Sequence, residues 1–311
     1  MLRQTFLWLS RQPGIFRFVR DNGLARRFAS RFVAGETLEQ ALEAVRGLNA
    51  RGISATLDLL GESVTSPAEA DATAQEYLTL LDRIHAEGLD ANVSCKLTAM
   101  GQDIDEALCI ANITRVVERA RGYGSFVRLD MESSAYTDRT LALFHEHLYP
   151  RFPEAVGIVL QSYLRRTGDD VDHAIDIQCR VRLCKGAYKE PATVAFPDKA
   201  DVDASYVACM RRLMSAGRYP GIATHDEAII AEARRHAAAE GIAPDRFEFQ
   251  MLYGVRRDLQ ERLVRDGYRM RVYVPYGTQW YPYLMRRLAE RPANVMFMTG
   301  SILKERFAAR R

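Results

Sequence analysis

The sequence predicts one α/β domain over residues 1–311, a distorted (β/α)8 TIM-like barrel with N-terminal helices and a last helix over the barrel mouth. Short apolar runs alternate with amphipathic helical stretches about eight times, at intervals of roughly 25–40 residues, which is typical of a parallel sheet. A count near eight favours closure into a barrel. No run is followed by a G-x-G-x-x-G turn, so the fingerprint of an open dinucleotide-binding sheet is missing.

The elements follow in order along the chain. An N-terminal helical segment covers about residues 1–48, and in it Thr37 precedes an amphipathic helix that extends to Asn49. Later helices are clearest over 68–87 and 204–216. The predicted strands are 53–60, 91–97, 126–131, 157–161, 180–184, 222–224, 247–252 and 269–274.

Composition excludes several classes of function. The 43 basic and 40 acidic residues give a net charge of +3, which argues against nucleic-acid binding. The 5 cysteines are odd in number and contain no C-x-x-C pair, which argues against a disulfide framework and a structural zinc site. The histidines are scattered, so we expect no metal. The lack of a disulfide framework indicates a reducing, cytoplasmic environment. No apolar run approaches the length of a membrane span.

The first 35 residues are rich in arginine and poor in acidic residues. This composition is found in organelle transit peptides and in helices that lie on anionic lipid. We favour a third interpretation, a packing helix with a solvated basic face. Peripheral contact with the inner face of the membrane stays open as an alternative.

Polar and charged residues recur where the predicted strands end, and barrel enzymes carry their chemistry at that end. The residues are Lys96, Asp130, Gln161, Lys185, Thr224, His225 and Gln250, and Tyr273 lies in the last strand. Arg182 lies inside the fifth strand between apolar neighbours, where an unpaired charge would cost several kcal/mol. We therefore expect Arg182 to have a polar partner, from the protein or from a ligand.

A second group of residues follows the last strand. Tyr283, Arg286, Arg287 and Glu290 have the spacing i, i+3, i+4 and i+7, which places them on one helix face. Two adjacent guanidinium groups beside an aromatic ring are suited to gripping a carboxylate. We expect this helix to bind an acidic small molecule.

Several segments resemble the proline dehydrogenase family, in its bacterial monofunctional form. They are RFVAGE at 31–36, SCKL at 94–97, DME at 130–132, RLCKGAY at 182–188, ATH at 223–225, EFQML at 248–252, PYG at 275–277 and YLMRR at 283–287. The similarity covers about residue 25 to the C-terminus, and its motifs occur in the family's order.

The resemblance implies oxidation of L-proline to 1-pyrroline-5-carboxylate with non-covalent FAD. It implies a catalytic set of Lys96, Asp130, Tyr273, Arg286 and Arg287. Proline would be bound by Lys96, Leu252, Tyr273, Tyr283, Arg286 and Arg287. The implied flavin contacts are Gln161, Arg182, Cys184, Lys185, Gly186, Ala187, Thr224, His225, Arg287 and Glu290.

The resemblance also implies that electrons pass to a quinone and that the product is used by a 1-pyrroline-5-carboxylate dehydrogenase. Glu62 follows the first strand, and the first and last strands of a barrel are neighbours. We therefore expect Glu62 and Arg286 to form a gate that closes over the occupied pocket.

Two alternatives stay open. A barrel lyase would use Lys96 to form a Schiff base, and such a protein would be colourless. A non-catalytic carboxylate-binding protein would show no turnover of proline.

Overall fold

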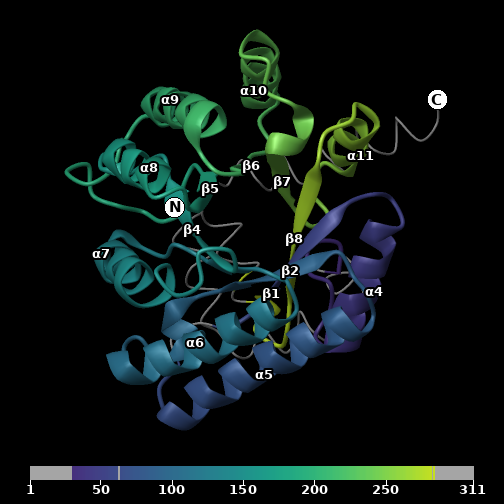
Figure 1. The fold of residues 1–311 in the computed structure, drawn as a ribbon, viewed down its shortest axis with the longest axis vertical. Helices are drawn as coiled ribbons and strands as arrows, with labels where there is room; N and C mark the ends of the chain where they lie inside the picture. Colours follow the sequence, from purple (N-terminus) through teal and green to yellow (C-terminus); the bar gives the residue numbers. More distant parts are fainter. Residues whose placement is uncertain (1–29, 62–63, 282, 284–311) are drawn as a thin grey trace.

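The computed structural model describes residues 30–61, 64–281 and 283, and its centre is a closed barrel of eight parallel strands (Figure 1). Each strand pairs with the next along the chain, and β1 also pairs with β8. In that closing pair Ser54 lies opposite Arg271 and Leu59 lies opposite Tyr276. The predicted α/β barrel is confirmed.

All eight strands overlap the ranges that the sequence predicts. They are β1 (Ser54–Leu59), β2 (Ala91–Cys95), β3 (Val127–Leu129), β4 (Val156–Gln161), β5 (Arg180–Cys184), β6 (Gly221–Ala223), β7 (Glu248–Leu252) and β8 (Met270–Tyr276). The last strand extends beyond the predicted end at Val274 because it pairs with β1 residue by residue as far as Leu59.

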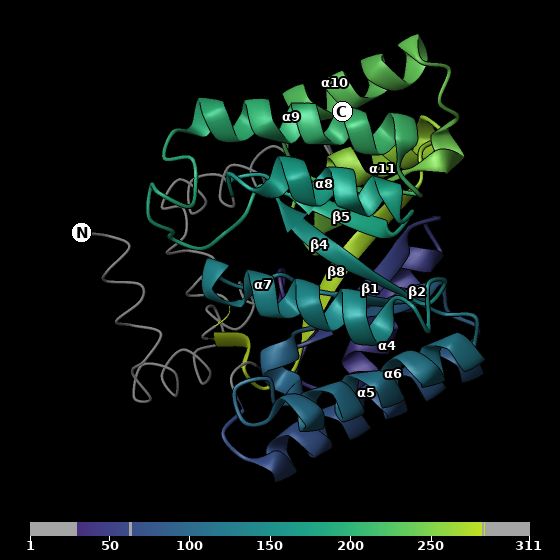
Figure 2. The same cartoon turned by 60° about the vertical axis from the view of Figure 1, so that its left-hand side comes forward.

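Helices surround the barrel on its outer side (Figures 1 and 2). They are α4 (Leu38–Asn49), α5 (Pro67–Ala86), α6 (Glu106–Gly122), α7 (Ser134–Leu143), α8 (Thr167–Asp176), α9 (Lys199–Ala216), α10 (Glu227–Ala239) and α11 (Arg257–Arg265). Thr37 and Gln40 form a capping box at the start of α4, as the N-cap prediction requires. No described helix is both long and apolar enough to cross a bilayer.

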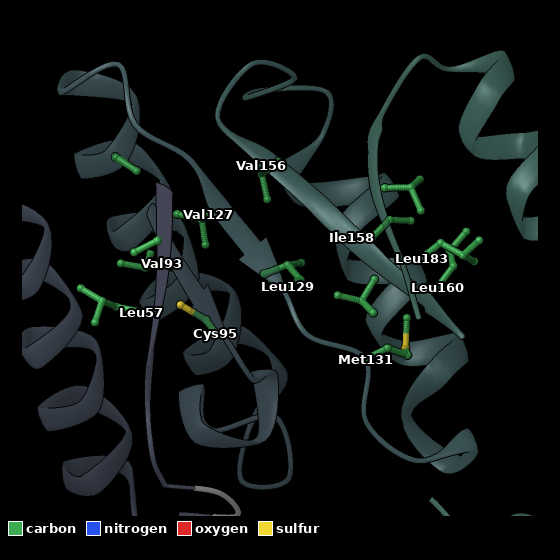
Figure 3. Close-up of a cluster of buried hydrophobic side chains, with 14 of the residues drawn as sticks. Leu57, Val93, Cys95, Val127, Leu129, Met131, Val156, Ile158, Leu160 and Leu183 are labelled. Atoms are coloured by element: carbon green, nitrogen blue, oxygen red, sulfur yellow. The ribbon is translucent and has the colours of Figure 1, made fainter. Parts of the chain in front are cut away.

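The two faces of the strands differ in chemistry. The outward face packs against the helices and is apolar, as Leu57, Val127, Ile158 and Leu183 show in Figure 3. The inward face carries Thr56, Asp58, Asn92, Ser94, Arg128, Arg182, Glu248, Gln250, Arg271 and Tyr273. Barrels of this class usually fill their interior with branched apolar side chains. The polar interior therefore departs from the usual filling of such barrels.

The segment before α4 is fastened to the end of β8. Ala34 N–H donates to the Pro275 carbonyl at 2.9 Å, and Gly277 N–H donates to the Gly35 carbonyl at 3.0 Å. The Trp280 indole N–H donates to a Glu36 carboxylate oxygen at 2.7 Å. These contacts fix the path of the chain where it leaves the barrel.

Candidate active site

Four of the predicted site residues meet at the carboxyl end of the barrel, around Asp130. Its carboxylate accepts hydrogen bonds from Arg182 Nη1 at 2.8 Å and from the Tyr273 hydroxyl at 2.7 Å. The Ser94 hydroxyl donates a third hydrogen bond at 2.6 Å, and Lys96 Nζ lies 3.9 Å from Oδ2. Side chains from β2, β5 and β8 thus converge on the residue that follows β3.

The surroundings of Asp130 keep it ionised. Burial by itself would raise its pKa, but the charges of Arg182 and Lys96, with hydrogen bonds from Ser94 and Tyr273, outweigh burial and lower the pKa. The pKa of Tyr273 is raised well above its ordinary value, mainly by burial and then by the charge of Asp130. Tyr273 therefore remains a neutral hydrogen-bond donor.

Asp58 is a site residue that the sequence analysis missed. It lies in β1, its side chain is 1% exposed, and both of its oxygens accept from Lys96 Nζ, at 2.9 and 3.0 Å. Burial raises the pKa of Asp58 more than Lys96 lowers it, and the charge of Asp130 raises it further. The signal was present in the sequence, because Asp58 is a charge inside an apolar strand, as Arg182 is.

Arg182 has several partners within the protein. Nε donates to Gln250 Oε1 at 2.6 Å, and Nη1 donates to Asp130 and, at 3.2 Å, to Ser94. The guanidinium carbon lies 5.2 Å from the centre of the Tyr273 ring, within range of a cation–π contact. Nη2 donates to none of the residues that the structure describes. Arg182 is therefore anchored through two of its nitrogens, Nε and Nη1.

Gln161 is the last residue of β4, and among the described residues only the nitrogen of its side-chain amide has hydrogen-bond partners. Its Nε2 donates to the carbonyls of Met131 and Glu132, each at 3.3 Å. Its Oε1 is buried and accepts no hydrogen bond within the described part of the chain. A buried acceptor of this kind calls for a donor, such as a ligand or an ordered water.

Lys185 follows β5 and lies between two carboxylates. Its Nζ is 2.5 Å from Asp203 and 3.0 Å from Asp226. Burial tends to raise the pKa of both aspartates, but hydrogen bonds from Lys185, and charge or hydrogen bonding from Lys199, lower them overall. Four alternating charges thus lie together beside the ends of β5 and β6.

The remaining predicted flavin contacts that the structure describes lie near the carboxyl ends of β5, β6 and β7, which we call the rim of the barrel. His225 Nε2 accepts from the Leu252 N–H at 2.9 Å, which links the end of β7 to the residues after β6. The Thr224 hydroxyl accepts from the Asp226 N–H at 3.1 Å. Cys184, Gly186 and Ala187 are all half-buried around the end of β5.

Gly186 has a positive φ of 100°, and a Cβ there would lie 2.2 Å from the Tyr163 ring. Only glycine therefore fits the turn that follows Lys185.

Four predicted site residues lie outside the described residues: Glu62, Arg286, Arg287 and Glu290. Tyr283 is described and is 7% exposed. Within the described residues, no group of three His, Cys, Asp or Glu side chains could hold a metal ion. The structure thus describes the part of the predicted site that the barrel strands and the residues next to them contribute.

Comparison with known proteins identifies the family. The family model described as "Proline dehydrogenase" matches residues 41–300. A proline dehydrogenase of Deinococcus radiodurans is 44% identical over 307 residues, which are 98% of each chain. The bifunctional protein PutA of Salmonella typhimurium is 30% identical over 88% of this chain and 24% of its own length.

Solved structures agree with the sequence comparison. Proline utilization A of Bdellovibrio bacteriovorus, inactivated by N-propargylglycine, superposes with a TM-score of 0.82 at 27% identity. The match covers 93% of this chain and 36% of that one. The chain therefore belongs to the proline dehydrogenase family.

Proposed function

We propose that the chain oxidises L-proline to 1-pyrroline-5-carboxylate with non-covalently bound FAD. The observation that carries this proposal is the cluster of Lys96, Asp130, Arg182 and Tyr273 at the carboxyl end of the barrel. This cluster combines cations for a carboxylate, an aromatic wall for a ring, and an anchored guanidinium beside them.

Two atoms of the site fit a flavin. Arg182 Nη2 is a donor, and Gln161 Oε1 is a buried acceptor, and neither has a partner among the described residues. The isoalloxazine ring carries both acceptors and an N–H donor, and proteins tune it through such hydrogen bonds. We propose that Lys185, Thr224 and His225 bind other parts of FAD, with Cys184, Gly186 and Ala187 along the same rim and Glu290 on the last helix.

The substrate would be held through its carboxylate and its ring. Lys96 presents an ammonium group whose position is fixed by Asp58. Arg286 and Arg287 would complete a three-cation clamp, because guanidinium groups bind carboxylates through paired hydrogen bonds. Leu252, Tyr273 and Tyr283 would form the wall around the pyrrolidine ring. Tyr283 is buried by the protein itself.

The reaction needs orientation more than acid–base catalysis. The ring carbon that is next to nitrogen and does not carry the carboxylate loses a hydride, and the nitrogen loses a proton to the medium, which leaves a C=N double bond. FAD, when bound, supplies the acceptor for that hydride. The residues of this chain would hold the ring in place, keep Asp130 ionised beside it and exclude water.

Electrons would then pass to a quinone, which suits peripheral contact with the inner face of the membrane. The product would be used by a 1-pyrroline-5-carboxylate dehydrogenase. In the Salmonella relative, the matching region is about a quarter of a chain named as bifunctional, which is consistent with such coupling. We also propose that Glu62 and Arg286 form a gate over the occupied pocket.

The geometry around Lys96 argues against a Schiff-base lyase. That mechanism requires a neutral amine that is free to attack a carbonyl. Both oxygens of Asp58 lie within hydrogen-bonding distance of Nζ, at 2.9 and 3.0 Å, so the amine is held by a carboxyl group and is not free to attack. A non-catalytic carboxylate-binding protein would have no use for the donor and acceptor left open on Arg182 and Gln161.

One experiment tests the proposal. The purified protein should be yellow with a flavin absorption spectrum, and adding L-proline without oxygen should bleach it. D-proline is the matched control, because it places the carboxylate or the ring carbon wrongly. A colourless protein would contradict the cofactor, and a yellow protein that proline does not bleach would contradict the substrate.

A further inference from the structure

A row of buried hydrogen bonds connects the floor of the barrel to Arg182. Glu248 and Gln250 lie two residues apart in β7, so both side chains point into the barrel. Gln250 Nε2 donates to Glu248 Oε1 at 2.6 Å, and Arg182 Nε donates to Gln250 Oε1 at 2.6 Å. The exposed fraction is 4% for Glu248, 4% for Gln250 and 6% for Arg182.

The amide of Gln250 has one permitted orientation. An arginine side chain can only donate, and an ionised carboxylate can only accept. The amide oxygen must therefore face Arg182, and the amide nitrogen must face Glu248. A reversed amide would set donor against donor at one end and acceptor against acceptor at the other.

Glu248 is itself held in place as an acceptor. Arg271 Nε donates to the same Oε1 at 2.8 Å, and the Tyr219 hydroxyl donates to Oε2 at 3.1 Å. Burial tends to raise the pKa of Glu248, but the charge of Arg271 and hydrogen bonds from Arg271 and Gln250 lower it overall. Glu248 is thus a fixed, ionised end of the row.

Strand β6 leaves space for this amide. A Cβ on Gly221 would lie 2.4 Å from Gln250 Nε2 and 2.9 Å from its Cδ. Gly221 is also the register partner of both Arg182 and Glu248. The absent side chain therefore opens the gap that the Gln250 amide occupies between its two partners.

We propose that Glu248 and Gln250 are positioning residues that set the rotation of the Arg182 guanidinium, so that Nη2 faces the flavin. Asp130 anchors the guanidinium at Nη1, and Gln250 anchors it at Nε. Two anchors on different nitrogens fix the plane of the group, whereas one would leave it free to turn. The inference rests on FAD as the cofactor, and neither positioning residue needs to touch substrate.

The first test is a double-mutant cycle on FAD release. Holoenzyme is diluted, and the rise of flavin fluorescence gives the rate of release. Gln250→Met should release FAD about tenfold faster than the parent, because a hydrogen bond to a charged group is lost. In an Arg182→Met background, loaded with excess FAD before dilution, the same substitution should change the rate less than about twofold, because Gln250 acts through Arg182.

The second test uses two substitutions of Glu248 that remove the same charge. Glu248→Gln keeps Oε1, which accepts from both Gln250 and Arg271, whereas Glu248→Met removes that acceptor. Both should lower the melting temperature, because Arg271 loses its ion pair. Only Glu248→Met should speed FAD release, by about as much as Gln250→Met. Gly221→Ala, which crowds the amide without removing a polar group, should act in the same direction.

Several results would overturn the inference. Equal acceleration by Gln250→Met in both backgrounds would make Gln250 a purely structural residue. Equal rates of FAD release from Glu248→Gln and Glu248→Met, both faster than the parent, would show that the charge of Glu248 matters and the orientation of the Gln250 amide does not. Parent-like release from every variant would contradict the positioning role alone. A parent protein that purifies without FAD would contradict the proposed cofactor as well.

Discussion

The two faces of the barrel strands are both largely buried but chemically opposite. Leu183 faces the helices at 0% exposure, and Arg182, its neighbour in β5, faces the interior at 6%. The outward face stabilises the barrel through apolar contacts, which are not directional. The inward face is held by hydrogen bonds and ion pairs, which need defined partners. We infer that both faces stabilise the fold, and that only the inward face also serves chemistry.

The largest effect on stability should come from the inward face. Asp130→Asn leaves Arg182 and Lys96 without their shared carboxylate, which should lower the free energy of unfolding by about 3–5 kcal/mol at pH 7. Urea titrations at a fixed concentration of FAD would measure this. Asp71→Asn is the matched control, because Asp71 is 61% exposed in its pair with Arg115, and should cost at most about 1 kcal/mol.

The cost of Asp130→Asn should depend on pH. The native pKa of Asp130 is lowered, so its ionisation stabilises the fold at pH values above the unfolded pKa, about 3.9. That contribution is lost as the pH falls through the lower native pKa. The difference between parent and variant should be constant from about pH 5 to 8 and should shrink below about pH 4. A difference that grows in acid would contradict the assigned shift.

A substitution on the outward face should lower the free energy of unfolding by a comparable amount without changing the flavin spectrum. Leu183→Ala removes apolar contacts and leaves a cavity, so it should lower the free energy of unfolding by about 2–5 kcal/mol. The folded fraction should keep the flavin spectrum of the parent. A changed spectrum at unchanged stability would mean that the two faces are not separate in function.

The smallest effect should come from a single hydroxyl of the inward face. Tyr273→Phe removes the hydrogen bond to Asp130 but keeps the ring beside Arg182. It should lower the free energy of unfolding by about 1.5 kcal/mol and leave FAD bound. Tyr268→Phe keeps the ring contacts and removes a hydroxyl that makes no hydrogen bond within the described residues, so it should change nothing measurable by urea titration. Loss of FAD from Tyr273→Phe would assign the hydroxyl to the flavin instead.

The sequence predicted the outward face better than the inward one. Apolar runs identify strands whatever their partners are, so all eight strands were found. The partners of polar residues depend on closure of the barrel. Asp58 and Lys96 are 38 residues apart, and Arg182 and Gln250 are 68 apart. No local pattern predicts such pairs.

The same limit explains which residues were missed. Asp58 and Glu248 lie before the carboxyl ends of their strands, where the sequence analysis mainly searched. Gln250 was found at a strand end but was given no role. Alternation along β7 would have indicated Glu248 and Gln250, because both occupy inward positions. The pairing of Lys185 with Asp203 required the placement of α9, which the sequence leaves open.

One measurement tests the division between the two faces most directly: the ratio of bound FAD to protein in Arg182→Met and Leu183→Ala, purified side by side at equal FAD concentration. The two residues are adjacent in β5 and point in opposite directions. We predict that Arg182→Met folds but loses most of its FAD, whereas folded Leu183→Ala keeps a ratio close to that of the parent. Full FAD occupancy in Arg182→Met would contradict the account and make Arg182 a structural ion-pair residue.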